Sequence, residues 1–257
     1  MKTYVINLDR SAERLVHMNK QLSALGIPFE RIGAVDGSAL AQSMLDDHSP
    51  MLPGTIGCFL SHQQVWQQMI KSGESHALVL EDDALLSPRL VDYVHISDWI
   101  PDGVDIVRIE GDDIRPVELS SRPAATVAGR GLHKTLSNCH GSVAYILTRR
   151  AAEFLLAGSS SLPEPLDLYV FGKQPREILK VHQIVPALAR QLSMDTIEGV
   201  GMFASTIAQV DLSRIRREPR TLRTFFRKCL EMMIRLPGRI LALLGLGGSY
   251  STRIPFE

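Results

Sequence analysis

The sequence predicts an α/β fold in which a mostly parallel sheet is flanked by helices. Short apolar runs typical of buried strands alternate along the chain with longer segments whose apolar residues recur every three or four positions. Strands that alternate with helices indicate parallel βαβ units. With 257 residues, 45% of them hydrophobic, the chain is long enough to bury one large core.

The N-terminal segment predicts the first βαβ unit. Residues 3–8 form an apolar run, and Ser11 is placed to cap a helix that Gly26 and Pro28 end. The apolar residues of that helix lie at helical spacing: Leu15, Met18, Leu22 and Leu25. A second strand is expected at residues 29–35, followed by a turn at Asp36.

Further elements follow in the same alternation. We expect a helix from residue 56 to about 71, capped by Thr55, and a shorter helix after Thr148. Additional strands are expected at three apolar runs: residues 104–109, 143–147 and 181–185.

The most informative segment is the apolar run 76–80, which ends in Glu81, Asp82 and Asp83. Three adjacent acids would repel one another inside a sheet, so they are expected at the carboxyl end of the strand, where α/β sheets bind ligands. Because side chains alternate along a strand, Glu81 and Asp83 should share one face and Asp82 the other. Carboxylate oxygens suit Mg²⁺ or Mn²⁺ bridging to a phosphate; the alternative is a solvated acidic turn.

A second candidate site follows the first strand, where Asn7, Asp9 and Arg10 precede Arg14 by one or two helical turns. Two arginines near a helix N-terminus can bind a diphosphate. Asp36, after the next strand, could accept hydrogen bonds from a ribose or a base. The alternative is an exposed helix face on which Arg10 and Arg14 pair with Glu13.

Asp167 lies in a proline-flanked stretch, residues 163–169, and could act as a general base toward an acceptor hydroxyl; a surface turn is the alternative. His62, between Phe59 and Trp66 at helical spacing, is expected to be a packed or hydrogen-bonded histidine. The sequence contains no GxGxxG, GxxxxGK[ST] or GxSxG motif. This argues against dinucleotide dehydrogenases, P-loop NTPases and serine hydrolases of the α/β type.

The net charge is zero, but residues 214–239 carry nine basic residues against two acids, a local charge of +7. We therefore expect two regions: a body at residues 1–205 and a basic amphipathic helical tail at residues 206–257. Three widely spaced cysteines without a CxxC pair fit free thiols in a reducing cytosol. The N-terminal apolar run is too short for a signal peptide or a membrane span.

Taken together, the motifs resemble glycosyltransferase family 25, the group of bacterial lipooligosaccharide β-1,4-galactosyltransferases and related collagen galactosyltransferases. Single blocks are weak signals, but their order over roughly residues 3–191 is specific. The blocks are residues 5–11 (VINLDRS), Arg14, residues 34–37 (AVDG), 54–62 (GTIGCFLSH), 78–83 (LVLEDD), 141–148 (GSVAYILT) and 165–169 (PLDLY).

The resemblance implies a GT-A type, Rossmann-like transferase that moves a sugar, galactose in most of the family, from a UDP-sugar to a glycan acceptor with inversion. It implies that Asp83 ligates Mn²⁺ or Mg²⁺ and that Glu81 and Asp82 contact the donor. Asp167 is the predicted base. The predicted nucleotide side comprises Asn7, Asp9, Arg10, Arg14 and Asp36.

A basic amphipathic tail suits an anionic membrane surface, so we expect a cytoplasmic protein held peripherally at the inner membrane, with a glycolipid acceptor and no nucleic acid partner. The tail could instead pack on its own domain or form an oligomer contact. Two other functions stay open. One is an inactive sugar-nucleotide-binding or scaffold protein in envelope assembly; the other is a metal-dependent phosphohydrolase that uses His140 or His182.

Overall fold

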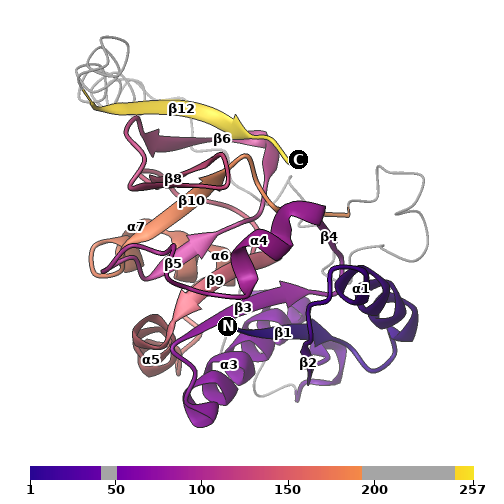
Figure 1. Cartoon of the computed structure of the whole chain (residues 1–257). Coiled ribbons are helices and arrows are strands. Elements are labelled where there is room, and N and C mark those ends of the chain that lie inside the picture. Colours follow the sequence, from indigo (N-terminus) through magenta and orange to yellow (C-terminus); the bar gives the residue numbers. More distant parts are fainter. Residues whose placement is uncertain (42–50, 193–246) are drawn as a thin grey trace.

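The computed structural model describes residues 1–41, 51–192 and 247–257. Its centre is an eight-stranded sheet in the order β2-β1-β3-β9-β5-β10-β8-β7 (Figure 1). These strands are β1 (Lys2–Asn7), β2 (Glu30–Gly33), β3 (His76–Glu81), β5 (Ile106–Arg108), β7 (Ala125–Val127), β8 (Arg130–Lys134), β9 (Ala144–Thr148) and β10 (Val181–Val185).

The sheet is mixed, although most of its strands share one direction. β1 pairs in parallel with β2 and β3, and β5 pairs in parallel with β10. β9 is antiparallel to β3 and β5, and β8 is antiparallel to β10 and β7, so these two strands alone within the sheet run the other way. The predicted α/β fold is therefore confirmed, with two reversed strands.

Helices cover both faces of the sheet (Figure 1). The sheet therefore separates two hydrophobic clusters, one on each face. On one face the buried residues of α3, α5 and α6 pack against Tyr4, Val79 and Tyr145. On the other face α1 and α4 pack against Val5 and Leu80. The helices are α1 (Ala12–Ala24), α3 (Pro53–Ser72), α4 (Val91–Val94), α5 (Arg149–Gly158), α6 (Leu166–Phe171) and α7 (Lys173–Arg176). None of the helices in the described part of the chain has the length and apolar character that crossing a bilayer requires.

The register of the first strands brings the predicted motifs to one edge of the sheet. Ile6 pairs with Glu81 on one side and with Ile32 on the other, so β1, β2 and β3 end at the same level. Short 3₁₀ turns, η1 (Gly37–Ala39) and η2 (Pro88–Leu90), and a small sheet of β4 (Ala84–Leu86) and β11 (Ala189–Gln191) complete this region.

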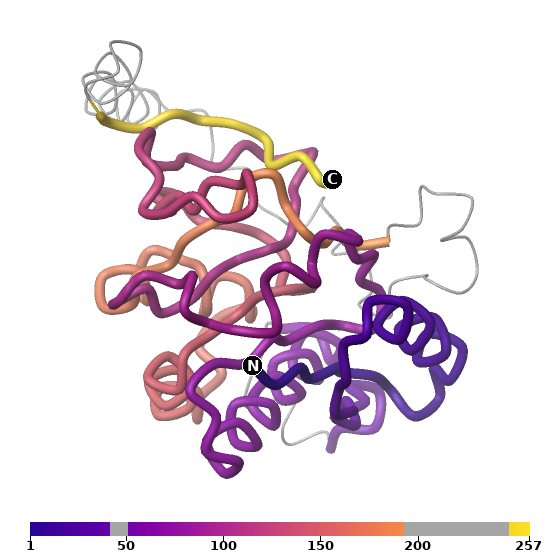
Figure 2. The backbone as a smooth tube through the Cα atoms, viewed as in Figure 1, coloured from indigo at the N-terminus to yellow at the C-terminus, as the bar shows by residue number. Residues whose placement is uncertain are grey.

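The last residues of the chain join the body. β12 (Ser249–Ile254) pairs antiparallel with β6 (Asp112–Ser120), and Ile254 is fully buried. Figure 2 shows this C-terminal ribbon at the end of the molecule opposite the N-terminal βαβ unit. Residues 249–254 fall within the predicted tail 206–257 but form part of the folded body. The predicted amphipathic helix lies outside the described residues, as does most of the predicted boundary region.

The helix boundaries correct one predicted cap and confirm the position of another. α3 begins at Pro53, with Leu52 as its cap residue, so the prediction of Thr55 as the cap was wrong. A proline in the first turn fixes a helical φ and lacks the N–H that would otherwise go unpaired there. The short helix predicted after Thr148 is α5, and Thr148 caps it by accepting a hydrogen bond from the backbone N–H of Ala151. Ser11 is the cap residue of α1, but its side chain makes no capping hydrogen bond.

Gly57 of α3 lets the helix approach the loop that carries Asp36. A Cβ at Gly57 would lie 2.6 Å from the carbonyl oxygen of Val35 and 2.8 Å from the backbone nitrogen of Gly37. Both are backbone atoms, which cannot turn aside as a flexible side chain can. Glycine at position 57 therefore allows α3 and the Asp36 loop to lie in direct contact.

We predict that Gly57→Ala lowers the free energy of unfolding by about 2 kcal/mol, because the added methyl group forces the helix and the loop apart. Helix propensity alone predicts the opposite sign, a gain of up to about 1 kcal/mol. Urea unfolding measures the difference. Gly33→Ala is the control, since a Cβ there meets nothing within 4 Å; a stabilised Gly57→Ala variant would contradict the close approach.

Candidate active site

The carboxyl ends of β1, β2 and β3 border a cleft of about 310 Å³. Residues far apart in the chain line it, from the loop after β1, the Asp36 turn, the start of α3, the end of β3 and β11. The predicted site residues that line it are Asn7, Arg10, Arg14, Asp36, Glu81, Asp82 and Asp83. Asp9 is not among them: its side chain is 91% exposed and pairs with Arg31.

Asp82 is fully engaged by the protein itself. One carboxylate oxygen accepts a hydrogen bond from Arg14 at 2.9 Å and the other accepts from Asn7 at 2.7 Å. The side chains of Arg14 and Asp82 are 8% and 9% exposed. This ion pair ties α1 to the ends of β1 and β3, so Asp82 has a structural task besides any contact with a ligand.

Glu81 turns to the opposite face of the sheet from Asp82, as strand alternation predicts. Its Oε1 accepts a hydrogen bond of 2.7 Å from the Ser142 hydroxyl and lies 3.4 Å from Nε2 of His62 in α3. Burial raises the pKa of Glu81, but the contacts with His62 and Ser142 outweigh burial and the net shift is downward. Glu81 is therefore ionised at neutral pH.

Asp83 is held by residues about 108 positions later in the chain. Its Oδ2 accepts a hydrogen bond of 3.0 Å from Gln191, and its backbone carbonyl accepts from Leu192. Burial, together with the negative charge of Glu81, raises the pKa of Asp83 to about 7. Its Oδ1 is buried without a hydrogen-bond partner. A buried carboxylate oxygen that lines the cleft and lacks a partner fits a hard divalent cation such as Mn²⁺ or Mg²⁺.

Arg10 and Asp36 face each other across the mouth of the cleft and form an ion pair. Asp36 also accepts hydrogen bonds from the backbone N–H and the hydroxyl of Ser38. These bonds cap the 3₁₀ turn η1 that follows β2. The side chains are 49% and 31% exposed, so solvent and ligands can reach both. Two of the five residues predicted for the nucleotide side, Arg10 and Asp36, thus lie at one rim of the cleft.

Asp167, at the N-terminus of α6, lines a second cavity that adjoins the cleft. The two cavities share Cys58, Glu81 and Gln191 as common lining. Asp167 Oδ2 lies 3.3 Å from Nδ1 of His140, and Oδ1 accepts from the backbone N–H of Leu168 at 2.9 Å. Burial raises the pKa of Asp167, but the His140 and backbone hydrogen bonds outweigh burial and lower it overall.

Sequence patterns did not indicate several residues of the cleft. Gln191 reaches Asp83 from β11, and no local motif marks it. Ser142 reaches Glu81 from the loop before β9; it lies in the block 141–148, but the sequence pattern indicated no role for it. Ser61 accepts a hydrogen bond of 2.9 Å from the backbone N–H of Val35, which fastens the Asp36 loop to α3. His62 is fully buried and bonded to the Tyr145 hydroxyl at 2.8 Å, as expected for a packed histidine, yet it also contacts Glu81.

The two histidines considered for a phosphohydrolase do not converge on the acids. His182 lies buried in β10 and lines neither cavity. His140 contacts Asp167 rather than the carboxylates at the end of β3. This arrangement does not favour a phosphohydrolase.

Comparison with known proteins identifies similar chains. A model of glycosyltransferase family 25 (LPS biosynthesis protein) matches residues 1–170. The lacto-N-neotetraose biosynthesis glycosyltransferase LgtB of Neisseria gonorrhoeae is 32% identical over 209 residues, which cover 74% of each chain. LgtE of the same organism is 28% identical over 250 residues, which cover 88% of this chain and 87% of LgtE.

The lipooligosaccharide biosynthesis protein lic2B of Haemophilus influenzae is 26% identical over 184 residues, 66% of this chain and 69% of lic2B. Among solved structures, a glycosyltransferase involved in glycosylation of the major capsid of PBCV-1 matches with a TM-score of 0.42 and 9% identity. That match covers 76% of this chain and 95% of the other.

We predict that Asp82→Asn lowers the free energy of unfolding by about 3 kcal/mol, because it removes the buried charge that faces Arg14. Asp9→Asn is the matched control: its pair with Arg31 is exposed at Asp9, and its loss should change stability by about 0.5 kcal/mol or less. Urea unfolding of both variants measures the difference. Equal stabilities would show that Asp82 is not a structural anchor.

Proposed function

The chain belongs to glycosyltransferase family 25, and from this membership and the geometry of the cleft we propose that it transfers galactose from UDP-galactose to a lipooligosaccharide acceptor. The names of its relatives, which refer to lacto-N-neotetraose and lipooligosaccharide biosynthesis, support a glycan acceptor of this class. We propose that the transfer is a direct displacement with inversion at the anomeric carbon.

One observation carries the proposal: two adjoining cavities share a wall at Glu81, with the carboxylate of Asp83 and the guanidinium of Arg10 in one and the carboxylate of Asp167 in the other. Direct displacement needs a leaving group and an attacking hydroxyl on opposite sides of the reacting carbon. The larger cleft suits the nucleotide diphosphate, and the adjoining cavity around Asp167 suits the acceptor.

Asp167 has the properties of the base in this proposal. Its pKa lies below the usual range, so the carboxylate is ionised at neutral pH and can accept the proton of an acceptor hydroxyl. His140, at 3.3 Å, orients the carboxylate. The carboxylate of Asp167 is thus held in a fixed orientation in a cavity that α6 and the loop before β9 border.

The leaving diphosphate develops negative charge, which the cleft can stabilise from its own residues. Arg10 at the rim can exchange its contact with Asp36 for a phosphate oxygen, because both side chains are exposed to ligands. A divalent cation held by Asp83 would supply further positive charge next to the diphosphate. Arg14 contributes a buried positive charge behind Asp82.

The test is turnover of a UDP-sugar panel with Mn²⁺ or with EDTA, read as UDP release with and without a lactose-type or lipooligosaccharide acceptor. We predict that acceptor-dependent release occurs with UDP-galactose, that EDTA abolishes it and that Asp167→Asn lowers kcat by about 10²- to 10⁴-fold. Glu164→Gln, a neighbouring acid outside both cavities, should leave kcat within about twofold of the wild-type value.

Two results would overturn this proposal. UDP release from another sugar alone would replace galactose as the donor. Failure to bind or turn over any UDP-sugar would favour the scaffold alternative. Retained activity in Asp167→Asn would show that the protein is a transferase in which Asp167 is not the general base.

We propose in addition that the basic stretch 214–239 holds the enzyme at the anionic inner face of the cytoplasmic membrane, near a glycolipid acceptor. The local charge of +7 supports this, since each basic residue near such a surface contributes about 1 kcal/mol. Replacing its nine basic residues with glutamine should abolish sedimentation with anionic vesicles. Truncation from Arg214 is a poorer test because it also removes β12. If the glutamine variant sediments with the vesicles as the wild type does, the proposed membrane contact is wrong.

A further inference from the structure

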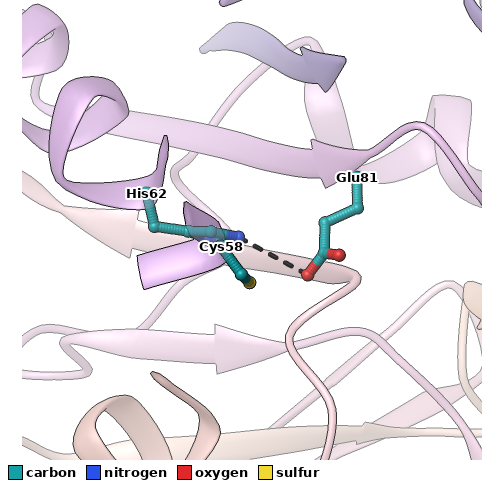
Figure 3. A group of neighbouring side chains, drawn as sticks. All are labelled: Cys58, His62 and Glu81. Carbon is teal, nitrogen blue, oxygen red and sulfur yellow. Dashed lines mark ion pairs between the residues drawn. The ribbon is translucent and has the colours of Figure 1, made fainter. Parts of the chain in front are cut away.

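Cys58, His62 and Glu81 bring a thiol, an imidazole and a carboxylate together at the wall between the two cavities. Cys58 and His62 lie one helical turn apart on α3 and therefore on the same face of the helix, while Glu81 ends β3. Figure 3 shows the three side chains converging. The sulfur, a ring nitrogen and a carboxylate oxygen all lie within 4.8 Å of one another.

The orientation of His62 is the second observation that indicates a ligand. The side chain is completely buried, and its Nε2 has no hydrogen-bond partner although it lies 3.4 Å from Glu81 Oε1. The other ring nitrogen, Nδ1, is 2.8 Å from the Tyr145 hydroxyl, and the two rings stack at 5.7 Å. These contacts fix the imidazole and aim Nε2 at the carboxylate and the thiol.

Such support from behind is what metal-binding histidines have, because a partner at one ring nitrogen sets the tautomer and direction of the other. With a metal on Nε2, the ring proton is on Nδ1 and is donated to the Tyr145 oxygen. Trp66 also donates to that oxygen, at 3.1 Å. Ser142 holds the carboxylate of Glu81 in the same way. Two of the three candidate ligands are therefore fixed by neighbouring side chains.

We propose that Cys58, His62 and Glu81 form a Zn²⁺ site with three protein ligands and one open position. Zn²⁺ bonds of about 2.0–2.3 Å place ligand atoms about 3.3–3.6 Å apart, which small side-chain rotations reach from the observed separations. A thiolate and an imidazole favour Zn²⁺ over Mg²⁺ or Mn²⁺, which prefer oxygen ligands. The site is thus chemically distinct from the cation position at Asp83.

Access and charge are consistent with this site. Cys58 and Glu81 line both cavities, so an ion can enter from solvent. On binding, the thiol of Cys58 loses its proton to solvent, and the ion's two positive charges meet the negative charges of Cys58 and Glu81. The inference goes beyond the proposed transferase activity, and it is measured without any sugar nucleotide.

The experiment is a Co²⁺ titration of the purified full-length protein after chelator treatment, because a Co²⁺–thiolate bond gives a charge-transfer band in the near ultraviolet. We predict that the band saturates at one equivalent of Co²⁺ per protein and disappears when Zn²⁺ displaces the Co²⁺. Cys58→Ser should lose the band, whereas Cys139→Ser should keep it, since Cys139 is a buried free thiol away from both cavities.

Competition with a chromophoric chelator then measures the Zn²⁺ affinity. Glu81→Gln and Cys58→Ser should each weaken it at least about tenfold, by analogy with the loss of other metal-site partners. Absence of the band in the wild-type protein, or a band that persists in Cys58→Ser, would overturn the site and leave His62 and Glu81 as an ion pair. Failure of the UDP-sugar assay would not affect the band, so the two proposals fail separately.

Discussion

Three carboxylates at the end of one central strand are the constraint on which the architecture of the cleft depends. Buried acids are unstable unless each one gains a cation or hydrogen-bond donors. Here each acid draws on a different part of the chain: Asp82 on α1, Glu81 on α3 and the loop before β9, and Asp83 on β11. Satisfying the acids therefore also fixes the walls of the cleft.

The three acids end in different electrostatic states. The charge of Asp82 is balanced by the buried Arg14, and Asn7 donates a second hydrogen bond to its carboxylate. Glu81 stays ionised through contacts with His62 and Ser142. Asp83 has a pKa near 7 because burial and Glu81 oppose its charge. A strand end with identical chemistry at three positions thus offers one structural anchor and two groups with capacity for ligands.

The sequence predicted the parts of the site that follow local rules. Apolar runs located β1, β3, β9 and β10 to within a residue or two, and strand alternation correctly separated Glu81 from Asp82. The motif order also identified the family correctly. These successes have one physical reason, because burial and pleating impose a periodic pattern on the local sequence.

The parts that escaped prediction depend on contacts between distant segments. Gln191 meets Asp83 across 108 positions of sequence, and Asp82 meets Arg14 across 68. Neither contact leaves a periodic signal. β12 likewise joins the body by pairing with β6, more than 100 residues earlier in the chain, and its neighbour Pro255 accepts a hydrogen bond from Ala187. Sequence patterns located the acids but not the partners that decide what each acid does.

The shared wall at Glu81 determines which substitutions can separate the two cavities. Glu81 lines both cavities and contacts α3 and the loop before β9, so replacing it alters both sides at once. Asp83 lines only the cleft, and Asp167 lines only the adjoining cavity. A change at Asp83 therefore alters the lining of the cleft, and a change at Asp167 alters the lining of the adjoining cavity, although Gln191, which bonds Asp83, lines both. Because Asp83 and Asp167 lie in different cavities, comparing the two single variants tests the proposed division into a donor side and an acceptor side, whereas a change at Glu81, which lines both cavities, does not.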